Sequence, residues 1–400
     1  MAGSAWGGSE ELWSRSALEL MKTQVRVSAS VAEWSSFHPR IAALRENGIS
    51  LHVRRSGYPI WRRGLHRFFG RKGSLELTEF ERFLSCDPPH LVVMSSGNPF
   101  PPIELAEFCA SRGLPFATIG HCNSDGWWVS DQDARRLRDV LPTARCCYFV
   151  SNANRILAEK QIGVELGNVE IVRNPFNVPF GAAPPWPSVP SAQQLRLACV
   201  GRLDPNAKGQ DILLEALVGP PWSSRPWHLS LFGDGLCAET LKRLTERFGL
   251  AQRVTFAGQV SDIVEIWKTH HVLVLPSRCE GMPLALIEAM LCGRPAVVTD
   301  VAGHAEIVCD GLTGFLAKAP TVAFFRAALE AMWARRGELE SMGKAAALSI
   351  RQKVPGDPIG VFVQKLKALT CEAKRSQSDD IFRSTRVDRV SACDAQSVRL

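Results

Sequence analysis

The sequence predicts an α/β protein made of two doubly wound domains, each with a parallel sheet covered by helices. Three observations lead to this prediction. Short apolar runs alternate with helical patterns through both halves of the chain, which is typical of parallel strands joined by crossover helices. With 400 residues, of which 46% are hydrophobic, the chain exceeds one ordinary domain. A proline-rich segment over 181–194 interrupts both patterns and is the predicted linker.

The first predicted domain covers residues 1–180. Its predicted strands are short apolar runs that lie near 24–31, 50–53, 91–95, 115–119, 146–150 and 169–172. The glycine pair Gly7-Gly8 has the character of a turn that follows a central strand and opens a helix, here over 12–20, but no strand precedes it. We therefore expect the first strand of this domain to be missing, because the chain has been cut short or because the sheet has a gap.

The second predicted domain covers 195–353 and repeats the alternation. Its strands are predicted at 195–200, 228–232, 254–256, 272–275 and 296–299, with helices between them. A further amphipathic helix near 359–369, within the segment 354–371, follows Pro355 and Pro358, and we expect it to pack back on the first domain. Residues 372–400 are polar, charged and without periodicity, so a mobile tail is expected there.

The composition and the beginning of the chain disfavour several classes of protein. No apolar run reaches the roughly 18 residues of a membrane-spanning helix, and the first residues lack the basic and apolar segments of a secretion signal. The 12 cysteines are scattered, without the spacing of a zinc site, and are expected to be reduced and mostly buried. We therefore predict a cytoplasmic protein that binds no metal and no other cofactor.

The net charge of +7 is unevenly distributed along the chain. A stretch over 54–72 is rich in Lys and Arg, is interleaved with aromatic residues and contains no acidic residue. Its cations are Arg54, Arg55, Arg62, Arg63, Arg67, Arg71 and Lys72. Two interpretations fit this pattern: a solvated surface, or a patch that binds anionic lipid headgroups and makes the protein peripheral at the inner face of the membrane. Nucleic acid binding is disfavoured.

Two glutamates flank the predicted start of the helix after strand 272–275. Glu280 lies in the loop at the carboxyl end of that strand, where open α/β sheets bind ligands. Glu288 falls with Leu284 and Leu291 on an apolar stripe, where an unpaired carboxylate costs several kcal/mol. Hydrogen bonds to ligand hydroxyls would give it partners, and the free amides at the helix start favour an anion. For either glutamate alone, a solvated surface acid is the competing interpretation.

A second glycine turn carries two cations. Gly201 follows the strand 195–200, and Arg202 and Lys208 flank the loop that leads to the next helix. Two cations at the carboxyl end of a strand can neutralise a diphosphate and stabilise it as a leaving group. Together with the two glutamates they predict a nucleotide-sugar site, with cations for the diphosphate and carboxylates for the sugar and ribose hydroxyls.

Glu280 and Glu288, separated by seven residues, resemble the hallmark of the family-four retaining glycosyltransferases, which have the GT-B fold. The resemblance runs from Gly201 to about Leu316. It includes Phe232-Gly-Asp-Gly235, Phe256-Ala-Gly258, Leu275-Pro-Ser277 and Asp310-Gly-Leu-Thr-Gly314. In the first half, Gly7-Gly8-Ser9-Glu10 resembles the family's glycine loop, Thr118-Ile-Gly-His121 resembles the strand end that bears a site histidine, and Arg173-Asn174-Pro175 resembles the start of the interdomain hinge.

The resemblance implies two Rossmann-like domains that face a central cleft, and a role for each predicted site residue. Arg202 and Lys208 would hold the donor phosphates, Glu280 the transferred sugar and Glu288 the ribose, while His121 would face the reaction from the opposite domain. The other positions implied in donor binding are Gly8, Gly201, Gly281, Met282, Pro283 and Leu284. The implied reaction moves a hexose, with retention, from a UDP-, GDP- or ADP-sugar to a glycan or a lipid-linked acceptor.

Other motifs and functions compete with this interpretation. Asp131 and Asp133 match the Asp-x-Asp motif of metal-dependent glycosyltransferases, but they follow Ser130 at a predicted helix start, where acids favour the helix dipole. Gly233-Asp-Gly235 follows a strand but lacks the third glycine of a dinucleotide site. A sugar-nucleotide epimerase, a glycan phosphorylase and a non-catalytic sugar-nucleotide-binding protein remain alternatives, and the missing strand favours the last.

Overall fold

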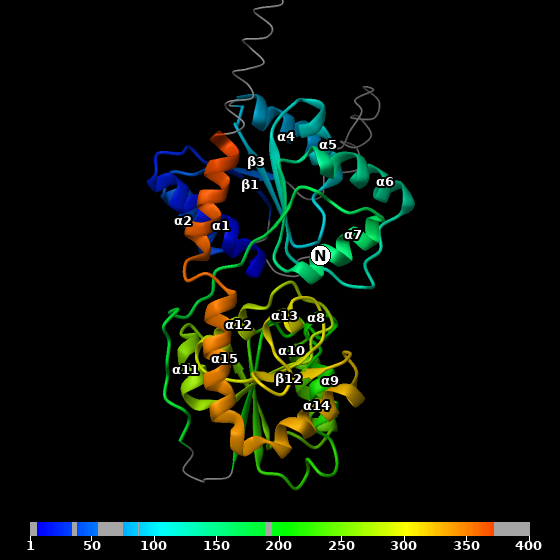
Figure 1. Cartoon of the computed structure of the whole chain (residues 1–400), viewed down its shortest axis with the longest axis vertical. Coiled ribbons are helices and arrows are strands. Elements are labelled where there is room, and N and C mark those ends of the chain that lie inside the picture. The colour runs from blue at the N-terminus through cyan, green and yellow to red at the C-terminus, as the bar shows by residue number, and fades with distance from the viewer. Residues whose placement is uncertain (1–5, 34–37, 55–74, 87, 189–193, 372–400) are drawn as a thin grey trace, which may run out of the picture.

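The computed structural model describes residues 6–33, 38–54, 75–86, 88–188 and 194–371. Within these residues the chain forms two α/β domains, with the N-terminal half above the C-terminal half in Figure 1. The tail at 372–400, and the basic stretch over 54–72 apart from Arg54, lie outside the described residues. None of the helices described combines the length and the apolar character needed to cross a bilayer.

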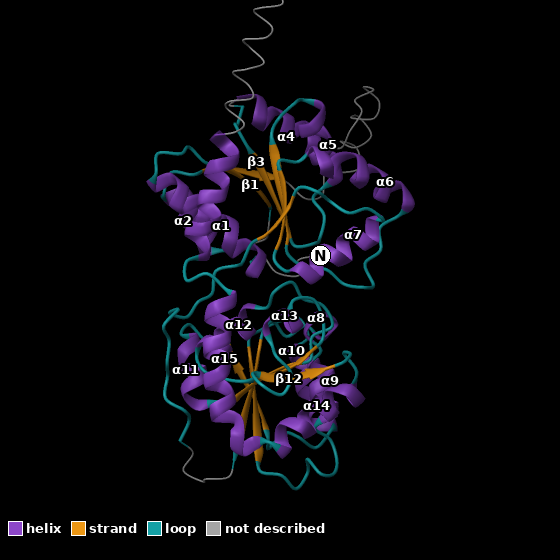
Figure 2. Ribbon diagram, in the orientation of Figure 1, coloured by secondary structure: helices purple, strands orange, loops and turns teal. Residues whose placement is uncertain are grey.

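The C-terminal domain is built on a six-stranded parallel sheet with the strand order β12-β11-β10-β7-β8-β9. Its strands are β7 (Leu195–Val200), β8 (Trp227–Phe232), β9 (Val254–Gly258), β10 (Val272–Leu275), β11 (Ala296–Thr299) and β12 (Gly314–Ala317). β10 and β11 are buried at every position, because helices cover both faces of the sheet (Figure 2). The strand order reverses between β7 and β10, and open α/β sheets bind ligands at such a point.

Helices connect the strands of this domain as the alternating pattern predicts. They are α8 (Pro205–Lys208), α9 (Gln210–Ala216), α10 (Ala238–Arg247), α11 (Ile263–Thr269), α12 (Leu284–Leu291), α13 (His304–Ile307), α14 (Val322–Ala334) and α15 (Leu339–Lys353). Pro283 is the residue before α12 rather than its first helical residue, and Gly293 follows the helix end with a φ of +73°. β12 is short and begins with a glycine, and the sequence pattern did not predict it.

The N-terminal domain contains two separate parallel sheets. One has the order β3-β4-β5-β6, and the other is the pair β1-β2. The strands are β1 (Ser28–Ala32), β2 (Ser50–Arg54), β3 (Val92–Ser96), β4 (Phe116–Gly120), β5 (Cys146–Phe149) and β6 (Val169–Ile171). The helices are α1 (Gly8–Lys22), α2 (Pro39–Glu46), α4 (Leu75–Cys86), α5 (Ile103–Ser111), α6 (Asp131–Val140) and α7 (Asn152–Ile162). In the described part of the chain no strand precedes α1, and the two sheets share no paired strands.

Two segments tie the halves of the chain together. The described part of the proline-rich segment lies along the C-terminal domain, where the Arg294 guanidinium donates to the carbonyl of Pro185 at 2.6 Å and lies over the Trp186 ring. The helix over 358–371 follows α15 and places Phe362 and Leu366 in a core of the N-terminal domain, next to α1 (Figure 1). Both domains are thus held by segments that cross between them.

Candidate active site

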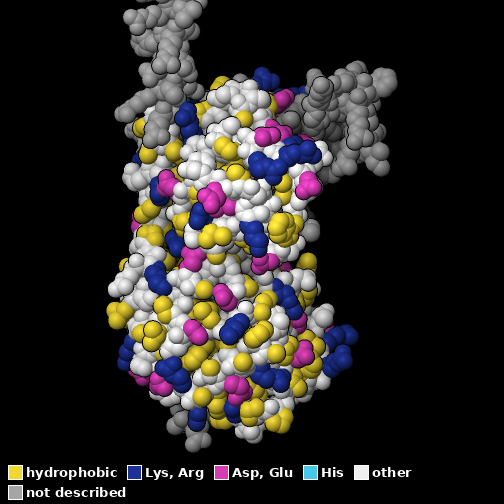
Figure 3. All heavy atoms as spheres, turned by 45° about the vertical axis from the view of Figure 1, so that its right-hand side comes forward, with side chains coloured by type: hydrophobic (Ala, Val, Ile, Leu, Met, Phe, Trp, Pro, Cys, Tyr) yellow, Lys and Arg dark blue, Asp and Glu magenta, His cyan; other side chains and the backbone are white. Residues whose placement is uncertain are grey.

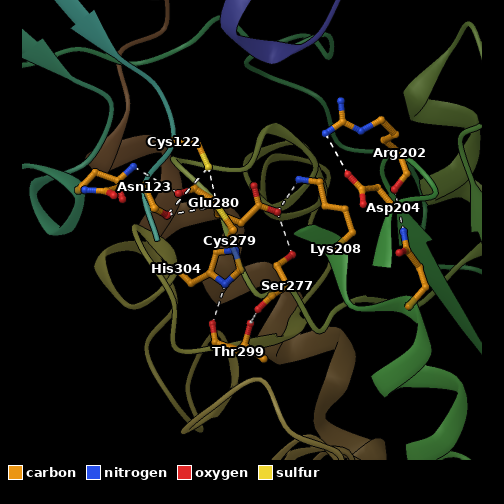
Figure 4. Close-up of polar contacts among 12 residues, drawn as sticks. Cys122, Asn123, Arg202, Asp204, Lys208, Ser277, Cys279, Glu280, Thr299 and His304 are labelled. Carbon is orange, nitrogen blue, oxygen red and sulfur yellow. Dashed lines mark hydrogen bonds and ion pairs between the residues drawn. The ribbon is translucent and has the colours of Figure 1, made fainter. Parts of the chain in front are cut away.

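The Glu280 carboxylate lies in the loop after β10, at the boundary between the two domains. It is 5% exposed. Its Oε1 accepts hydrogen bonds from Lys208 Nζ at 2.5 Å and from Ser277 Oγ at 2.8 Å (Figure 4). Its backbone carbonyl accepts from Asn123 N and from Asn154 Nδ2, both at 3.3 Å and both in the N-terminal domain. The second domain therefore supplies the carboxylate, and the first domain helps to position its backbone.

Lys208 reaches Glu280 from the end of α8. Gly209, which follows it, has a φ of +66°, and a Cβ there would lie 2.0 Å from the carbonyl oxygen of Pro276, so this close approach of the two loops requires glycine. Burial alone would lower the pKa of Lys208, but the Glu280 carboxylate outweighs burial and raises the pKa. Lys208 is therefore a permanent cation paired with Glu280.

Buried hydrogen bonds from the end of β11 and the start of α13 hold the Glu280 loop in place. Thr299 Oγ1 donates to the carbonyl of Ser277 at 2.6 Å. His304 Nδ1 lies 2.6 Å from the carbonyl of Thr299 and must donate, because a carbonyl only accepts (Figure 4). His304 is fully buried, and burial lowers its pKa, so its ring is neutral. These contacts hold Ser277 in position to bond Glu280.

A pocket of about 370 Å³ opens next to Lys208, at the carboxyl ends of β7 and β8. It is lined by Trp6, Val200, Gly201, Arg202, Phe232, Gly233, Asp234, Gln259, Val260, Ile263 and Ile266. Most of this lining is apolar, and Arg202, 3.4 Å from Asp204, adds a cation. The pocket is therefore largely apolar, with one cation, Arg202, and one carboxylate, Asp234, on its wall. A second pocket, of about 270 Å³, lies at the opposite, amino-terminal edge of the same sheet.

The glycines of Gly233-Asp-Gly235 are explained by the meeting of two loops. A Cβ on Gly233 would lie 2.2 Å from the carbonyl oxygen of Gly201, and one on Gly235 would lie 2.4 Å from that of Leu203. Both glycines therefore allow the loop after β8 to pack on the loop after β7. This packing explains why glycines occupy these positions, and no dinucleotide-binding role is needed to explain them.

His121 directly follows β4, and its backbone packs against the loop that carries Glu280. Its Nε2 lies 3.0 Å from Ser95 Oγ, and burial lowers the pKa of its ring to about 4, so the ring is neutral at pH 7. Its Nδ1 is buried and has no hydrogen-bond partner among the described residues. The domains touch here, because a Cβ on Gly281 would lie 1.6 Å from the carbonyl oxygen of His121. The structure thus brings His121, Gly281 and Glu280 together from both domains.

The starts of two helices meet at the same boundary. Gly8 begins α1, and a Cβ on it would lie 3.6 Å from the Leu284 side chain at the start of α12. Met282 and Pro283 are buried beside them. Helix N-termini favour anions. The amide of Gly7 already donates to Glu10 Oε2 at 2.9 Å, and burial raises the pKa of that carboxyl.

Glu288 has a partner within the protein. It lies on α12, 3% exposed, and its Oε1 accepts from the backbone N of Asn177 at 2.8 Å and from Asn177 Nδ2 at 3.1 Å. Burial raises its pKa, and the bonds from Asn177 lower it in part. The sequence predicted that this carboxylate needs a partner, and the structure shows one. The partner is Asn177, in the segment that leads into the linker, and not a ligand hydroxyl.

Asp131 and Asp133 lie at the first turn of α6, away from the Glu280 loop in sequence and structure. Ser130 Oγ accepts from the backbone N of Asp133 at 3.1 Å, so the prediction that this motif starts a helix is confirmed. Among the described residues no group of three or more His, Cys, Asp or Glu side chains is placed to hold a metal ion.

Several residues of the boundary carry no signal in the sequence. Glu306 on α13 accepts from the backbone N of Ala153 at 2.8 Å and pairs with Arg173 at 3.4 Å, both in the N-terminal half. Asn123 and Trp6 belong to no predicted motif, whereas Ser277 ends the motif Leu275-Pro-Ser277 but had no predicted role. Only Trp6 was next to one, the glycine pair, and its place in the pocket depends on how the domains meet.

The C-terminal domain matches a known family of enzymes. Residues 194–334 match the family described as glycosyl transferases group 1, so the predicted resemblance to a glycosyltransferase family is confirmed. The D-inositol 3-phosphate glycosyltransferase of Segniliparus rotundus is 31% identical over 155 residues, which are 37% of this chain and 34% of that protein. The same enzyme of Mycolicibacterium smegmatis is 34% identical over 131 residues, 32% of this chain and 30% of that protein. The chain therefore matches about a third of the length of these relatives.

The similarity of fold extends over nearly the whole chain. The Anabaena protein Alr3699/HepE in complex with UDP superposes with a TM-score of 0.68 at 19% identity and covers 93% of this chain and 98% of that one. The lipopolysaccharide outer core galactosyltransferase WaaB superposes with a TM-score of 0.63 at 19% identity, over 91% of this chain and 97% of that one. The predicted GT-B fold is confirmed.

Proposed function

We propose that this protein is a retaining glycosyltransferase that moves a hexose from a nucleotide-sugar donor to the hydroxyl of a glycan or a lipid-linked acceptor. The observation that carries the proposal is the Lys208–Glu280 pair at the domain boundary, next to a pocket of about 370 Å³ at the ends of β7 and β8. The family matched by residues 194–334 and the UDP-bound neighbour of the same fold support a nucleotide-sugar donor.

The pocket would take the nucleotide, with its diphosphate toward Arg202 and Lys208. Glu280 would accept hydrogen bonds from the hydroxyls of the hexose, and Glu288 would serve the ribose. In the structure described here Lys208 and Glu280 bond each other, and either one buried alone would carry an uncompensated charge. The phosphate oxygens and the sugar hydroxyls of the donor would replace the bonds of this pair.

Bond breaking at the anomeric carbon moves negative charge onto the leaving diphosphate. A cation held next to that position stabilises the transition state more than the ground state, which is the role given to Lys208, while Arg202 on the pocket wall would mainly hold the bound donor. We infer that the acceptor hydroxyl attacks on the face from which the diphosphate leaves, that a leaving phosphate oxygen takes its proton, and that configuration is retained. A neutral His121 would bond to the sugar without adding a charge.

The test is a turnover screen with UDP-, GDP- and ADP-sugars, with a glycan and lipid extract as acceptor and with EDTA present or absent. We expect one class of donor to be consumed, EDTA to have no effect, and Glu280→Gln to lower kcat about a hundredfold. Glu246→Gln, on the exposed face of α10, is the matched control. Activity that EDTA abolishes and manganese restores would contradict the role given to the two cations, and wild-type kinetics of Glu280→Gln would contradict the site.

A second candidate, a non-catalytic sugar-nucleotide-binding protein, is favoured by one observation. The N-terminal sheet is divided between β1-β2 and β3-β4-β5-β6, so the domain that would present the acceptor lacks a continuous sheet within the described residues. Calorimetric binding of a UDP-, GDP- or ADP-sugar without consumption of that donor in the same screen would favour this candidate over the transferase.

A further inference from the structure

Two cysteines from opposite domains meet beside Glu280. Cys122 follows His121 in the N-terminal domain, and Cys279 directly precedes Glu280 in the C-terminal domain (Figure 4). Their sulfur atoms are 2.8 Å apart, and both are free thiols. Cys146 and Cys147, although adjacent in β5, belong to different cores of the N-terminal domain. Cys122 and Cys279 are therefore close enough to react with each other, whereas Cys146 and Cys147 point into different cores.

The loop that carries each cysteine is fixed by contacts within its own domain. After Cys122, the Asn123 side chain donates to the buried Gln161 at 2.9 Å. Before Cys279, Arg278 forms two hydrogen bonds with Asp211, at 2.6 and 2.7 Å, and the backbone N of Cys279 donates to the carbonyl of Ala207. Cys279 Sγ also donates to the carbonyl of Asn123 at 3.3 Å. The two sulfur atoms therefore meet because both loops are fixed, and such positioning speeds reaction between them.

We propose that Cys122 and Cys279 form a reversible disulfide when the protein meets hydrogen peroxide, and that this bond ties the two domains together and stops turnover. In the first step a thiolate sulfur attacks peroxide: an S–O bond forms, the O–O bond breaks, and the released oxygen leaves as water. In the second step the other sulfur attacks the sulfenic acid: the S–S bond forms, the S–O bond breaks, and a second water leaves with the thiol proton. Two thiols are oxidised and one peroxide is reduced.

The environment of the pair sets the rate. The hydrogen bond to Cys279 and burial both raise the pKa of the Cys122 thiol. Only the thiolate attacks peroxide, so the reaction is slow at neutral pH and accelerates as the pH rises. Cys122 is half-buried whereas Cys279 is 7% exposed, so Cys122 is the sulfur that peroxide reaches first.

The effect of the disulfide on turnover follows from the contact between Gly281 and His121, which lies next to the two cysteines. The predicted effect on turnover rests on the proposed function. The backbone of Gly281 lies against the carbonyl of His121 with no room for a Cβ. A sugar can enter between His121 and Glu280 only if the domains separate here. A disulfide one residue from each of these side chains prevents that separation, and opening steps of this kind limit many turnover rates.

The experiment compares the reduced and the peroxide-treated full chain. The variants are Cys122→Ser and Cys279→Ser, with Cys237→Ser, at a half-buried thiol elsewhere in the C-terminal domain, as the matched control. After free thiols are blocked, non-reducing peptide mapping should find a Cys122–Cys279 cross-link in the wild type and in the control, and in neither of the other variants. Donor consumption should fall about tenfold or more with the cross-link and return with dithiothreitol.

Absence of the Cys122–Cys279 peptide from the oxidised wild type overturns the proposal, whatever the variants do. A complete cross-link with unchanged donor consumption overturns the claim that the disulfide stops turnover. Peptide mapping needs no activity, so a reduced wild type that consumes no UDP-, GDP- or ADP-sugar contradicts the proposed function alone and leaves the result on the disulfide intact.

Discussion

Lys208 and Arg202 come from the same loop, but the structure gives them different neighbours. Lys208 pairs with the buried Glu280, whereas Arg202 lines the pocket and lies 3.4 Å from Asp204. A cation next to the reacting centre acts on charge that develops in the transition state, while a cation on the pocket wall acts mainly on the bound donor. The two residues should therefore affect different kinetic constants.

We predict that Lys208→Ala lowers kcat about a hundredfold and that Arg202→Ala raises the KM for the donor about tenfold. Steady-state kinetics with the donor identified in the screen measures both. Lys268→Ala, an exposed lysine paired with Glu265 on α11, should leave both constants unchanged. Equal losses of kcat in the Lys208 and Arg202 variants would contradict the division of roles.

Buried neutral histidines should make the protein less stable in mild acid. Burial lowers the pKa of both His121 and His270 to about 4, against about 6.5 in the unfolded chain. The unfolded state therefore binds more protons as the pH falls below about 6.5, and each histidine costs about 2 kcal/mol of stability at pH 5, a cost that levels off at about 3 kcal/mol below pH 4. The raised pKa values of Glu10 and Glu288 act in the opposite direction.

Urea unfolding at pH 7 and pH 5 tests this with His270→Gln. His270 bonds Ser230 Oγ at 2.9 Å and the carbonyl of Ile266 at 3.0 Å, and glutamine can supply a donor and an acceptor without titrating. The stability lost between the two pH values should be about 2 kcal/mol smaller in the variant. An identical loss in the wild type and the variant would show that His270 does not titrate as its burial requires.

At the scale of elements, the loop between β10 and α12 is where the two domains touch. Gly281 has no side chain there, and a Cβ would lie 1.6 Å from the carbonyl oxygen of His121 and 2.8 Å from Val150 Cγ2. Since its φ is not in the left-handed region, alanine meets no backbone strain at this position. A side chain at this position is therefore unfavourable because it clashes with the other domain, not because it strains the backbone.

We predict that Gly281→Ala separates the domains at this point and lowers kcat about a hundredfold, because the groups from the two sides no longer meet. Small-angle scattering should show a larger radius of gyration. Gly167→Ala, which meets no atom within 4 Å, is the matched control and should change neither quantity. A variant with wild-type dimensions and kinetics would mean that the loops can shift without consequence.

The elements were predictable to different degrees. β7 and β10 are central strands whose apolar runs stand out in the sequence, because both faces of a parallel sheet are covered. β12 escaped prediction because its existence rests on pairing with β11, where Ala296 and Gly314 are partners. A Cβ on Gly314 would lie 2.4 Å from the carbonyl oxygen of Ala296, so this strand begins with the residue that a strand pattern disfavours.

At the scale of the whole molecule, charge is mixed on the face that Figure 3 presents. Figure 3 shows Lys and Arg side chains interspersed with Asp and Glu over both domains on the face that it presents. The basic stretch over 54–72 concentrates Lys and Arg in the sequence, and it is the segment proposed to give the protein affinity for an anionic membrane. Each cation near such a surface contributes about 1 kcal/mol, and salt screens the attraction.

We predict that the full chain sediments with anionic lipid vesicles at low salt and that a variant with four glutamines, at Arg62, Arg63, Arg67 and Arg71, does so much less. Lys242, Arg243 and Arg247 are exposed on α10, and their replacement by glutamine is the control that should leave sedimentation unchanged. Equal sedimentation of all three proteins, or none with the wild type, would return the stretch to the interpretation of a solvated surface and favour a soluble acceptor.

The sequence by itself determined the two α/β domains and the placement of Lys208 and Glu280 at one edge of the second sheet. Lys208 and Glu280 were predictable because a strand, a loop and a helix adjacent in the chain bring their residues to one edge of a sheet, so a local pattern suffices. A buried glutamate at position 288 also predicted a partner, since its burial follows from helix periodicity alone.

Only the tertiary structure decided what those residues meet. The bond of Asn177 to Glu288, the contact of Cys122 with Cys279 and the place of Trp6 in the pocket join segments that lie far apart in the chain. No local pattern encodes such contacts, because they depend on how two folded domains are set against each other by the crossing segments. Polar side chains and thiols at that boundary look like ordinary surface residues until both domains are in place.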